Sequence, residues 1–224
     1  MARGRAGSGQ RWVRRHPSAF LLAAQLSSLL LYPAIDESNH GRWVFGAIGL
    51  VVLPLAVWVV SRSAYVNLVA WLLAVPAVLL TVASAAWNEP ALMPACALLE
   101  SALYFYAAGS LITYMLRDAS VSTDDLFAAG ATFTLLAWGF AYAFYLCQVW
   151  YPASFVGMVE PERQRTWMEL LFLSFTNLSA VGVSDVLPVG SPARVLVMLE
   201  QFAGVGYIAT VVSHLIGMRI QQRH

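Results

Sequence analysis

The sequence predicts an all-α membrane protein with six transmembrane helices and one short helix that enters the membrane and leaves on the same side. Of its 224 residues, 59% are hydrophobic and only 11% are charged, whereas about a quarter of the residues in a soluble domain are charged. Six apolar runs are long enough to cross the hydrocarbon core, which takes roughly twenty helical residues. A seventh apolar run is too short to cross and ends in a polar turn.

The chain begins with a basic segment, residues 1–16, which precedes the first apolar run. A cleaved signal peptide also starts with basic residues, but a small-residue cleavage site would follow its apolar stretch. Here the run continues as Leu29-Leu30-Leu31-Tyr32-Pro33. We therefore expect a retained helix with its basic tail in the cytoplasm. All 13 basic residues are arginine, which is typical of a GC-rich bacterial genome.

Six runs are predicted to cross the membrane: 17–35, 43–61, 64–87, 92–116, 124–150 and 190–218. An even number of crossings places both termini on one side. If that side is cytoplasmic, nine arginines lie inside and four outside, in accord with the positive-inside rule. The four outside are Arg42, Arg163, Arg165 and Arg194. The predicted location is the cell (plasma) membrane, with both termini in the cytoplasm.

The chain divides near Ser122-Thr123-Asp124-Asp125, which supplies a helix N-cap and acidic residues for the first turn of the following run. Before this point, residues 17–121 form a predicted four-helix transmembrane domain. A voltage sensor needs arginines at every third position of the fourth span. Residues 92–116 contain no arginine, and Glu100 is their one charged residue. Residues 122–218 form the second predicted domain, and residues 219–224 form a short cytoplasmic tail.

Residues 166–178 make up the short apolar run, whose length suits a re-entrant helix. Entering from outside, this helix would point the partial negative charge of its C-terminal end toward the membrane centre, which favours a cation. Gly182 disfavours a continued helix, and an extended segment at 179–183 would present successive backbone carbonyls. Rings of carbonyls replace the water shell of a dehydrated cation. Because one chain supplies one strand of such a ring, several copies around an axis are needed.

The residues after this short helix resemble the selectivity filter of tetrameric potassium channels. The family pattern Thr-Val-Gly-Tyr-Gly-Asp aligns with Ala180-Val181-Gly182-Val183-Ser184-Asp185, and the family's Asp-x-x-Pro is Asp185-Val186-Leu187-Pro188 here. The resemblance covers residues 169–217 and implies a pore helix, a filter and an inner helix in a homotetramer. It implies a passive potassium channel with Asp185 at its outer mouth. The implied ion-coordinating residues are Ser179, Ala180, Val181, Gly182, Val183 and Ser184.

Three positions depart from the family pattern. Ala180 lacks the hydroxyl ligand of the family threonine, and Val183 cannot donate the sideways hydrogen bond of the family aromatic residue. Ser184 replaces the second glycine, and a positive φ at this residue would cost about 1 kcal/mol. A weakly selective sodium and potassium channel therefore stays an alternative, as does a membrane scaffold that no longer conducts.

Further residues are predicted to complete the site. Three are expected to support the filter: Thr176, Asn177 and Glu200. Glu200 would hydrogen-bond to the short helix, with Asn177 as a candidate partner. Gly204 occupies the hinge position of the family's inner helix. Candidate cavity and gate residues are Val205, Ile208 and Val212, although their helical spacing is equally consistent with packing.

The remaining ionisable residues and cysteines give little indication of a second functional site. Glu100 is expected to be neutral or paired, and His214 to be either interfacial or a proton-sensitive gate element. Cys96 and Cys147 lie near the outer ends of their spans, and their pairing stays open. The sequence lacks the spacing of a metal site, the arrangement of an enzyme active site and the basic cluster of a nucleic-acid interface. We expect permeant potassium or sodium ions in place of a cofactor. The expected partners are the bilayer and the other subunits, and a regulatory partner stays open.

Overall fold

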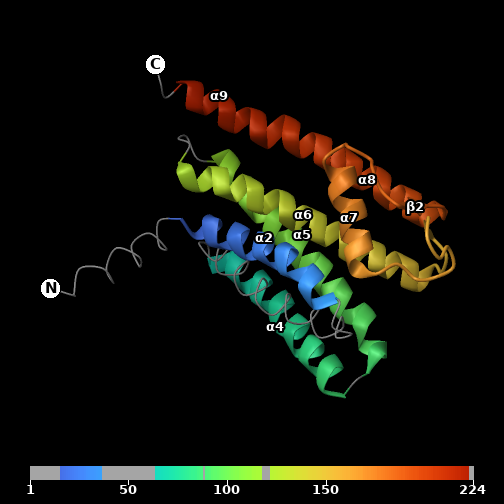
Figure 1. Cartoon of the computed structure of the whole chain (residues 1–224). Coiled ribbons are helices and arrows are strands. Elements are labelled where there is room, and N and C mark those ends of the chain that lie inside the picture. Colours follow the sequence, from blue (N-terminus) through green and yellow to red (C-terminus); the bar gives the residue numbers. More distant parts are fainter. Residues whose placement is uncertain (1–15, 37–63, 88, 118–121, 222–224) are drawn as a thin grey trace.

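A computed structural model describes residues 16–36, 64–87, 89–117 and 122–221 (Figure 1). The predicted second span, 43–61, and residues 1–15 of the basic segment lie outside them. Long helices run alongside one another, and a short helix, α7, lies across them next to α6 and α8 (Figure 1). The start of α2 and the end of α9 lie at one end of the molecule, opposite the strand β2 (Figure 1).

The first described helices agree with the predicted spans. α2 spans Pro17–Asp36, α4 spans Ala64–Trp87, and α5 spans Met93–Arg117 after a 3-10 turn, η1, at Pro90–Leu92. α4 packs against α5, while α2 and α5 both pack against α6. α2 and α5 therefore lie directly against the predicted second domain, and α4 lies on the far side of α5.

α6, Thr123–Trp150, is the central helix of the described chain. The Ser122 hydroxyl accepts a hydrogen bond from the Asp125 amide at 3.2 Å, and the Asp125 carboxylate accepts one from the Ser122 amide at 2.7 Å. This capping box confirms the predicted helix start. α6 is apolar on every face rather than amphipathic. This pattern fits its position, because α2, α5, α7 and α8 all pack against it.

The N-terminus of α2 is fixed to the N-terminus of α6. The Asp124 carboxylate accepts hydrogen bonds from the backbone amide of Ser18 at 3.2 Å and from its hydroxyl at 3.0 Å. Both residues are buried. A carboxylate at this position satisfies first-turn amides that lack a partner within their own helix.

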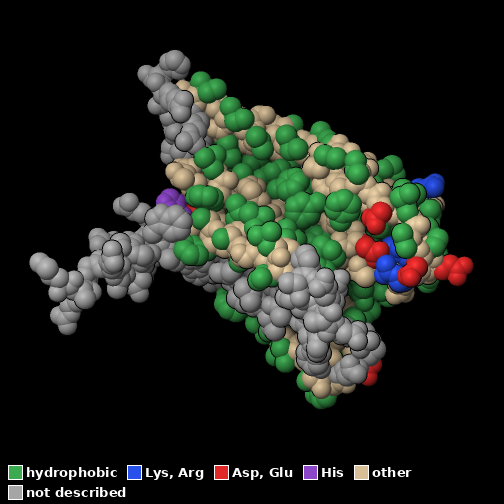
Figure 2. Space-filling view, viewed as in Figure 1, with side chains coloured by type: hydrophobic (Ala, Val, Ile, Leu, Met, Phe, Trp, Pro, Cys, Tyr) green, Lys and Arg blue, Asp and Glu red, His purple; other side chains and the backbone are tan. Residues whose placement is uncertain are grey.

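Three of the described helices are long and apolar enough to cross a membrane: Met93–Arg117, Thr123–Trp150 and Ser191–Met218. α2 and α4 contain shorter apolar helices, Pro17–Tyr32 and Leu68–Ser84. Figure 2 shows hydrophobic side chains over much of the described surface, while most charged side chains gather at the end that carries the loop between α6 and α7. The chain is therefore a membrane protein, and a count of six crossings stays a prediction.

The loops on either side of α7 pair with each other, which the all-α prediction missed. α7 spans Trp167–Leu178, in agreement with the predicted short helix. β1, Phe155–Gly157, precedes it and pairs antiparallel with β2, Val186–Pro188, which follows the polar turn. Beyond the pair, the Met158 amide donates to the Asp185 carbonyl at 2.9 Å. Residues 185–188, which follow the polar turn, are thus hydrogen-bonded to the loop that precedes α7.

The last predicted span is one continuous helical stretch (Figure 1) with an irregular middle. It comprises α8 at Ser191–Tyr207, a π-helical segment, η2, at Ile208–Val212, and α9 at Ser213–Gln221. The helix begins one residue after the predicted start at 190 and ends three residues after the predicted end at 218. The π-helical segment was not predicted, and such segments are rare and occur mostly as single turns inside α-helices.

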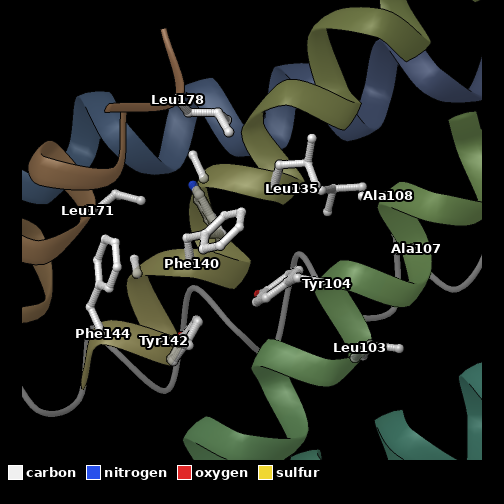
Figure 3. Close-up of a cluster of buried hydrophobic side chains, with 14 of the residues drawn as sticks. Leu103, Tyr104, Ala107, Ala108, Leu135, Phe140, Tyr142, Phe144, Leu171 and Leu178 are labelled. Carbon is white, nitrogen blue, oxygen red and sulfur yellow. The ribbon is translucent and has the colours of Figure 1, made fainter. Parts of the chain in front are cut away.

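Large buried side chains fill the space between α5, α6 and α7 (Figure 3). Tyr104 of α5 meets Trp138 of α6 with ring centroids 5.6 Å apart, and Trp138 meets Trp167 at 5.5 Å. Tyr142 also contacts Trp167, at 5.7 Å. Aromatic packing therefore joins α5 and α6 to the first residue of α7.

Candidate functional site

The short helix α7 has a complete capping box at its start. The Glu169 amide donates to the Thr166 hydroxyl at 3.3 Å, and the Thr166 amide donates to the Glu169 carboxylate at 2.6 Å. Arg163 adds an ion pair to Glu169 at 2.9 Å. Burial acts to raise the pKa of Glu169, but the hydrogen bonds from Thr166 and the contact with Arg163 lower it below its ordinary value. A negative charge is thus held at the positive end of the helix dipole.

A buried arginine organises the loop before α7, and sequence reasoning missed it. The Arg165 guanidinium donates to the carbonyl oxygens of Val159, Glu160 and Arg163 and lies 3.5 Å from Glu169. A Cβ at Gly157 would collide with this guanidinium. The loop therefore folds around the Arg165 guanidinium. Its burial depends on the path of the loop, which no sequence pattern predicts.

The backbone of Arg165 is hydrogen-bonded to the C-terminal end of α6. The Gln148 amide group donates to the Arg165 carbonyl at 2.9 Å, and the Arg165 amide donates to the Gln148 side-chain oxygen at 3.0 Å. Both residues are buried. These bonds fix the position of the start of α7 along the axis of α6.

The C-terminal end of α7 turns back in a Schellman motif. The Ala180 amide donates to the Asn177 carbonyl at 3.0 Å, and the Val181 amide donates to the Thr176 carbonyl at 2.9 Å. Ala180 carries the left-handed conformation of this motif, with φ of 60°. The segment predicted to be extended from residue 179 thus begins with a tight turn. The Thr176 carbonyl also accepts from Gly182 at 2.9 Å and from the Ser179 hydroxyl at 3.2 Å.

The expected positive φ at Ser184 is wrong. Among the described residues near the turn, positive φ occurs at Ala180 and at Gly182, where it is 70°. Ser184 instead accepts a hydrogen bond from the Val186 amide at 3.1 Å through its hydroxyl. A serine at this position therefore caps the start of β2 and needs no left-handed backbone.

The carbonyl oxygens of four successive residues are free within the described chain. Those of Ala180, Val181, Gly182 and Val183 accept no hydrogen bond from any described residue. Val181 and Val183 are 64% and 65% exposed, so this segment lies on the surface of the single chain. Four unused carbonyls in sequence are the ligand type that a dehydrated cation requires. Asp185 follows them and is also exposed.

α8 contacts the back of α7 through two successive polar residues. Asn177, the predicted partner of Glu200, lies beside its carboxyl group. Glu200 also hydrogen-bonds to Ser174, which contacts the Ala137 carbonyl of α6 at 2.8 Å. Asn177 accepts a hydrogen bond from the Gln201 amide group at 3.3 Å. The Thr176 hydroxyl donates to the Leu173 carbonyl in its own helix, so Thr176 supports the turn through its carbonyl oxygen.

Gly204 lies where α8 passes closest to α7. A Cβ at this position would overlap the Leu178 carbonyl group. The absence of a side chain therefore lets the two helices approach at the end of α7. The role of Gly204 seen here is close packing, and its predicted role as a hinge stays a prediction.

The candidate cavity and gate residues are divided between two surfaces. Val205 and Ile208 are exposed on the single chain, whereas Val212 packs against the buried core. Ile208 and Val212 are the two ends of the π-helical segment. A π-helix shifts the helical register, which explains why regular spacing from Val205 does not keep Val212 on the same face.

The remaining candidates lie away from the turn. Glu100 is buried in α5 and accepts a hydrogen bond from Thr81 of α4 at 3.3 Å. Cys96 and Cys147 are both free thiols and both buried. The described residues hold no group of three or more histidine, cysteine or acidic side chains that could bind a metal ion.

Comparison with known proteins identifies the family of the chain. A family model described as an ion channel matches residues 101–220, from the first half of α5 to the end of α9. No curated protein and no solved structure matches the chain. The matched region contains α6, α7, the turn with the free carbonyls and the long helix that passes behind it. Because the match covers more than half of the sequence, the chain belongs to this family of ion channels.

Proposed function

We propose that four copies of the chain form a passive cation channel that conducts potassium. The observation that carries this proposal is the row of free carbonyl oxygens at Ala180, Val181, Gly182 and Val183, which follows the C-terminal end of α7. Cation selectivity would come from these carbonyls together with the partial negative charge at that helix end. Asp185 would add negative charge at the outer mouth.

An apolar face of α8 supports assembly of several copies. Its exposed side chains recur at helical spacing: Val195, Met198, Leu199, Phe202 and Val205. The opposite face, with Ala193, Val197, Glu200 and Gly204, is buried against α6 and α7. In a tetramer, the exposed face would lie toward neighbouring copies and the central cavity, and α2, α4 and α5 would face lipid.

The same arrangement supports a membrane orientation. The start of α2 and the end of α9 lie at one end of the molecule, and the charged loop and β2 lie at the other (Figure 1). With the charged loop outside the cell, both termini are cytoplasmic in the plasma membrane. Cysteines introduced at Glu162 and at the C-terminus should react with a membrane-impermeant reagent from opposite sides.

Weak selectivity between sodium and potassium is the second candidate. It is favoured by Ala180, which has no hydroxyl ligand, and by Val183, whose side chain cannot donate the sideways hydrogen bond of the family aromatic residue. Purified protein in liposomes should take up potassium along its gradient if the first proposal holds. Equal fluxes of the two ions would favour the second, and no flux from a stable tetramer would support a scaffold.

A variant with an altered turn separates the filter from the rest of the protein. Gly182 has φ of 70°, but a Cβ there would meet no atom within 4 Å. Gly182→Ala should therefore strain the turn by about 1 kcal/mol and reduce the flux without preventing assembly. Gly109→Ala is the matched control, because a Cβ there is also in open space and the backbone is helical. Unchanged flux in Gly182→Ala would refute the filter assignment.

A further inference from the structure

The Ser174 hydroxyl contains a single proton but lies between two oxygen atoms. It is 2.8 Å from the Ala137 carbonyl of α6 and within hydrogen-bond distance of the Glu200 Oε1 of α8. Ser174 and Glu200 are both 0% exposed. The Ala137 carbonyl can only accept, so its contact with Ser174 is a hydrogen bond when the hydroxyl proton points toward it. The hydroxyl then has no proton left for Glu200, and Glu200 has to be the donor in that contact.

The reverse arrangement is less favourable. If the hydroxyl pointed toward Glu200, two acceptor oxygens would face each other at 2.8 Å without a proton between them. An ionised Glu200 would also be a buried charge, and the described residues place no cation beside it. Burial of an unpaired charge is costly. The hydrogen-bond geometry therefore favours a proton on Glu200 Oε1.

The surroundings of Glu200 are neutral. Its polar neighbours from α7 are Ser174 and Asn177, and from α6 it faces the Ala137 carbonyl through Ser174. Other ionisable side chains occur on the described elements packed against it: Arg194 and Tyr207 on α8, Glu169 on α7, and Asp124, Asp125, Tyr142, Tyr145 and Cys147 on α6. None of these forms a described hydrogen bond or ion pair with Glu200.

The chain of donors joins three helices directly behind the turn. The Glu200 carboxyl of α8 contacts the Ser174 hydroxyl of α7, which contacts the Ala137 carbonyl of α6. Two residues after Ser174, the Thr176 carbonyl receives the amides of Val181 and Gly182. One turn after Glu200, Gly204 meets the Leu178 carbonyl. A shift of α7 relative to α8 would thus move the free carbonyls.

We propose that Glu200 is a protonated positioning residue for ion conduction, which holds α7 in place by donating a hydrogen bond to Ser174. Transfer of this proton to hydroxide, with formation of water, leaves a carboxylate that cannot donate. The Ser174 hydroxyl then has two acceptors for one proton, and α7 loses its link to α8 or to α6. Conduction should fall reversibly as the pH is raised. This dependence on pH rests on the function proposed above, whereas the position of the proton does not.

The first test measures potassium flux into liposomes as a function of pH. The wild-type protein should lose most of its flux at alkaline pH and regain it on return to neutral pH. Glu200→Gln keeps a donor toward Ser174 but cannot ionise, so its flux should persist at alkaline pH. Glu100→Gln, at the other buried glutamate of the described chain, is the matched control and should keep the wild-type profile. An unchanged alkaline loss in Glu200→Gln would overturn the proposal.

Removal of the acceptor gives a second comparison. Ser174→Ala should lower the flux even at neutral pH, because it removes the hydroxyl that contacts both Glu200 of α8 and the Ala137 carbonyl of α6. Ser101→Ala is its matched control, since the Ser101 hydroxyl also donates to a carbonyl of α6, that of Gly139, at 2.9 Å, but has no carboxyl partner. Equal losses in the two variants would count against a specific role for Glu200 and Ser174.

An infrared measurement tests the proton without any need for conduction. The spectrum of the purified protein at alkaline pH minus that at neutral pH should show loss of the carbonyl stretch of a protonated carboxylic acid. The part of this band that belongs to Glu200 should disappear in Glu200→Gln and remain in Glu100→Gln. If it remains unchanged in Glu200→Gln, the proton assignment is wrong. If the band behaves as expected but the wild-type protein conducts no cation, the proposed function fails while the proton assignment stands.

Discussion

Ala180 is the residue whose conformation fits its side chain least well. It takes the left-handed position of the motif that ends α7, with φ of 60°, where glycine is preferred because a Cβ is disfavoured there. Ala180→Gly should therefore raise the stability of the folded protein by about 1 kcal/mol for each chain. Thermal unfolding of the detergent-purified protein checks this.

The control for this change is an alanine with an ordinary helical backbone. Ala143 lies in the interior of α6 and is partly exposed, so Ala143→Gly should lower stability by about 1 kcal/mol. Equal destabilisation by Ala180→Gly would show that the turn does not adopt the left-handed conformation in the folded protein.

Glu169 gives the start of α7 a defined dependence on pH. Its pKa is lowered in the folded protein, since hydrogen bonds from Thr166 and the contact with Arg163 outweigh the effect of burial. The stabilisation is therefore present above the unfolded pKa of about 4.3 and is lost as the pH falls through the folded value. Wild-type stability should decrease in acid, and Glu169→Gln should have a flatter profile.

Glu162 provides the comparison for this acid effect. It is an exposed glutamate in the same loop, and Glu162→Gln should leave the acid profile of thermal unfolding unchanged. A wild-type profile in Glu169→Gln would show that the carboxylate does not cap α7.

At the scale of elements, the approach of α8 to α7 depends on Gly204. Its missing Cβ leaves room for the backbone carbonyl of Leu178, which cannot rotate away as a flexible side chain could. Gly204→Ala should therefore cost about 1 to 3 kcal/mol in stability and separate the two helices. The midpoint of thermal unfolding measures this loss.

Gly217 is the matched position further along the same continuous helix. A Cβ there meets no atom within 4 Å, so Gly217→Ala should be neutral or slightly stabilising. If Gly204→Ala behaved in the same way, the close contact between α8 and α7 would be contradicted.

The sequence predicted the helices far better than their contacts. Thr166 and the polar turn after Leu178 define α7 because caps and breakers act within a few residues. Glu200 was correctly expected to bond to α7, and the bond to Ser174 was missed, while the predicted partner Asn177 lies beside the same carboxyl group. The contacts of Glu200 with Ser174 and Asn177 depend on how α7 and α8 are rotated about their axes and shifted along them. No local sequence pattern determines this arrangement.

Features that depend on the path of a loop were also missed. The burial of Arg165, the pairing of β1 with β2 and the positive φ at Ala180 each require segments that are distant in sequence or a turn whose geometry is set by its surroundings. The π-helical segment likewise has no glycine or proline within it to announce it.

At the scale of the whole molecule, α7 is held on three sides while its C-terminal turn faces outward. α6 contacts it through Ala137, and α8 contacts it through Glu200 and Gln201. The loop before it contacts it through Arg165, whose backbone is hydrogen-bonded to Gln148 of α6. The free carbonyls are thus fixed in position but have no partner within the described part of the chain. A symmetric assembly would bring four such rows together around one axis.

The most direct test of this account is the location of bound ions in the assembled protein. A crystal structure determined in a thallium salt, as a potassium substitute with strong anomalous scattering, should show four chains around one axis. The anomalous signal should lie on that axis, within coordination distance of the carbonyl oxygens of Ala180, Val181, Gly182 and Val183. An assembly without a shared axis at this turn, or an axis without thallium beside these carbonyls, would contradict the account.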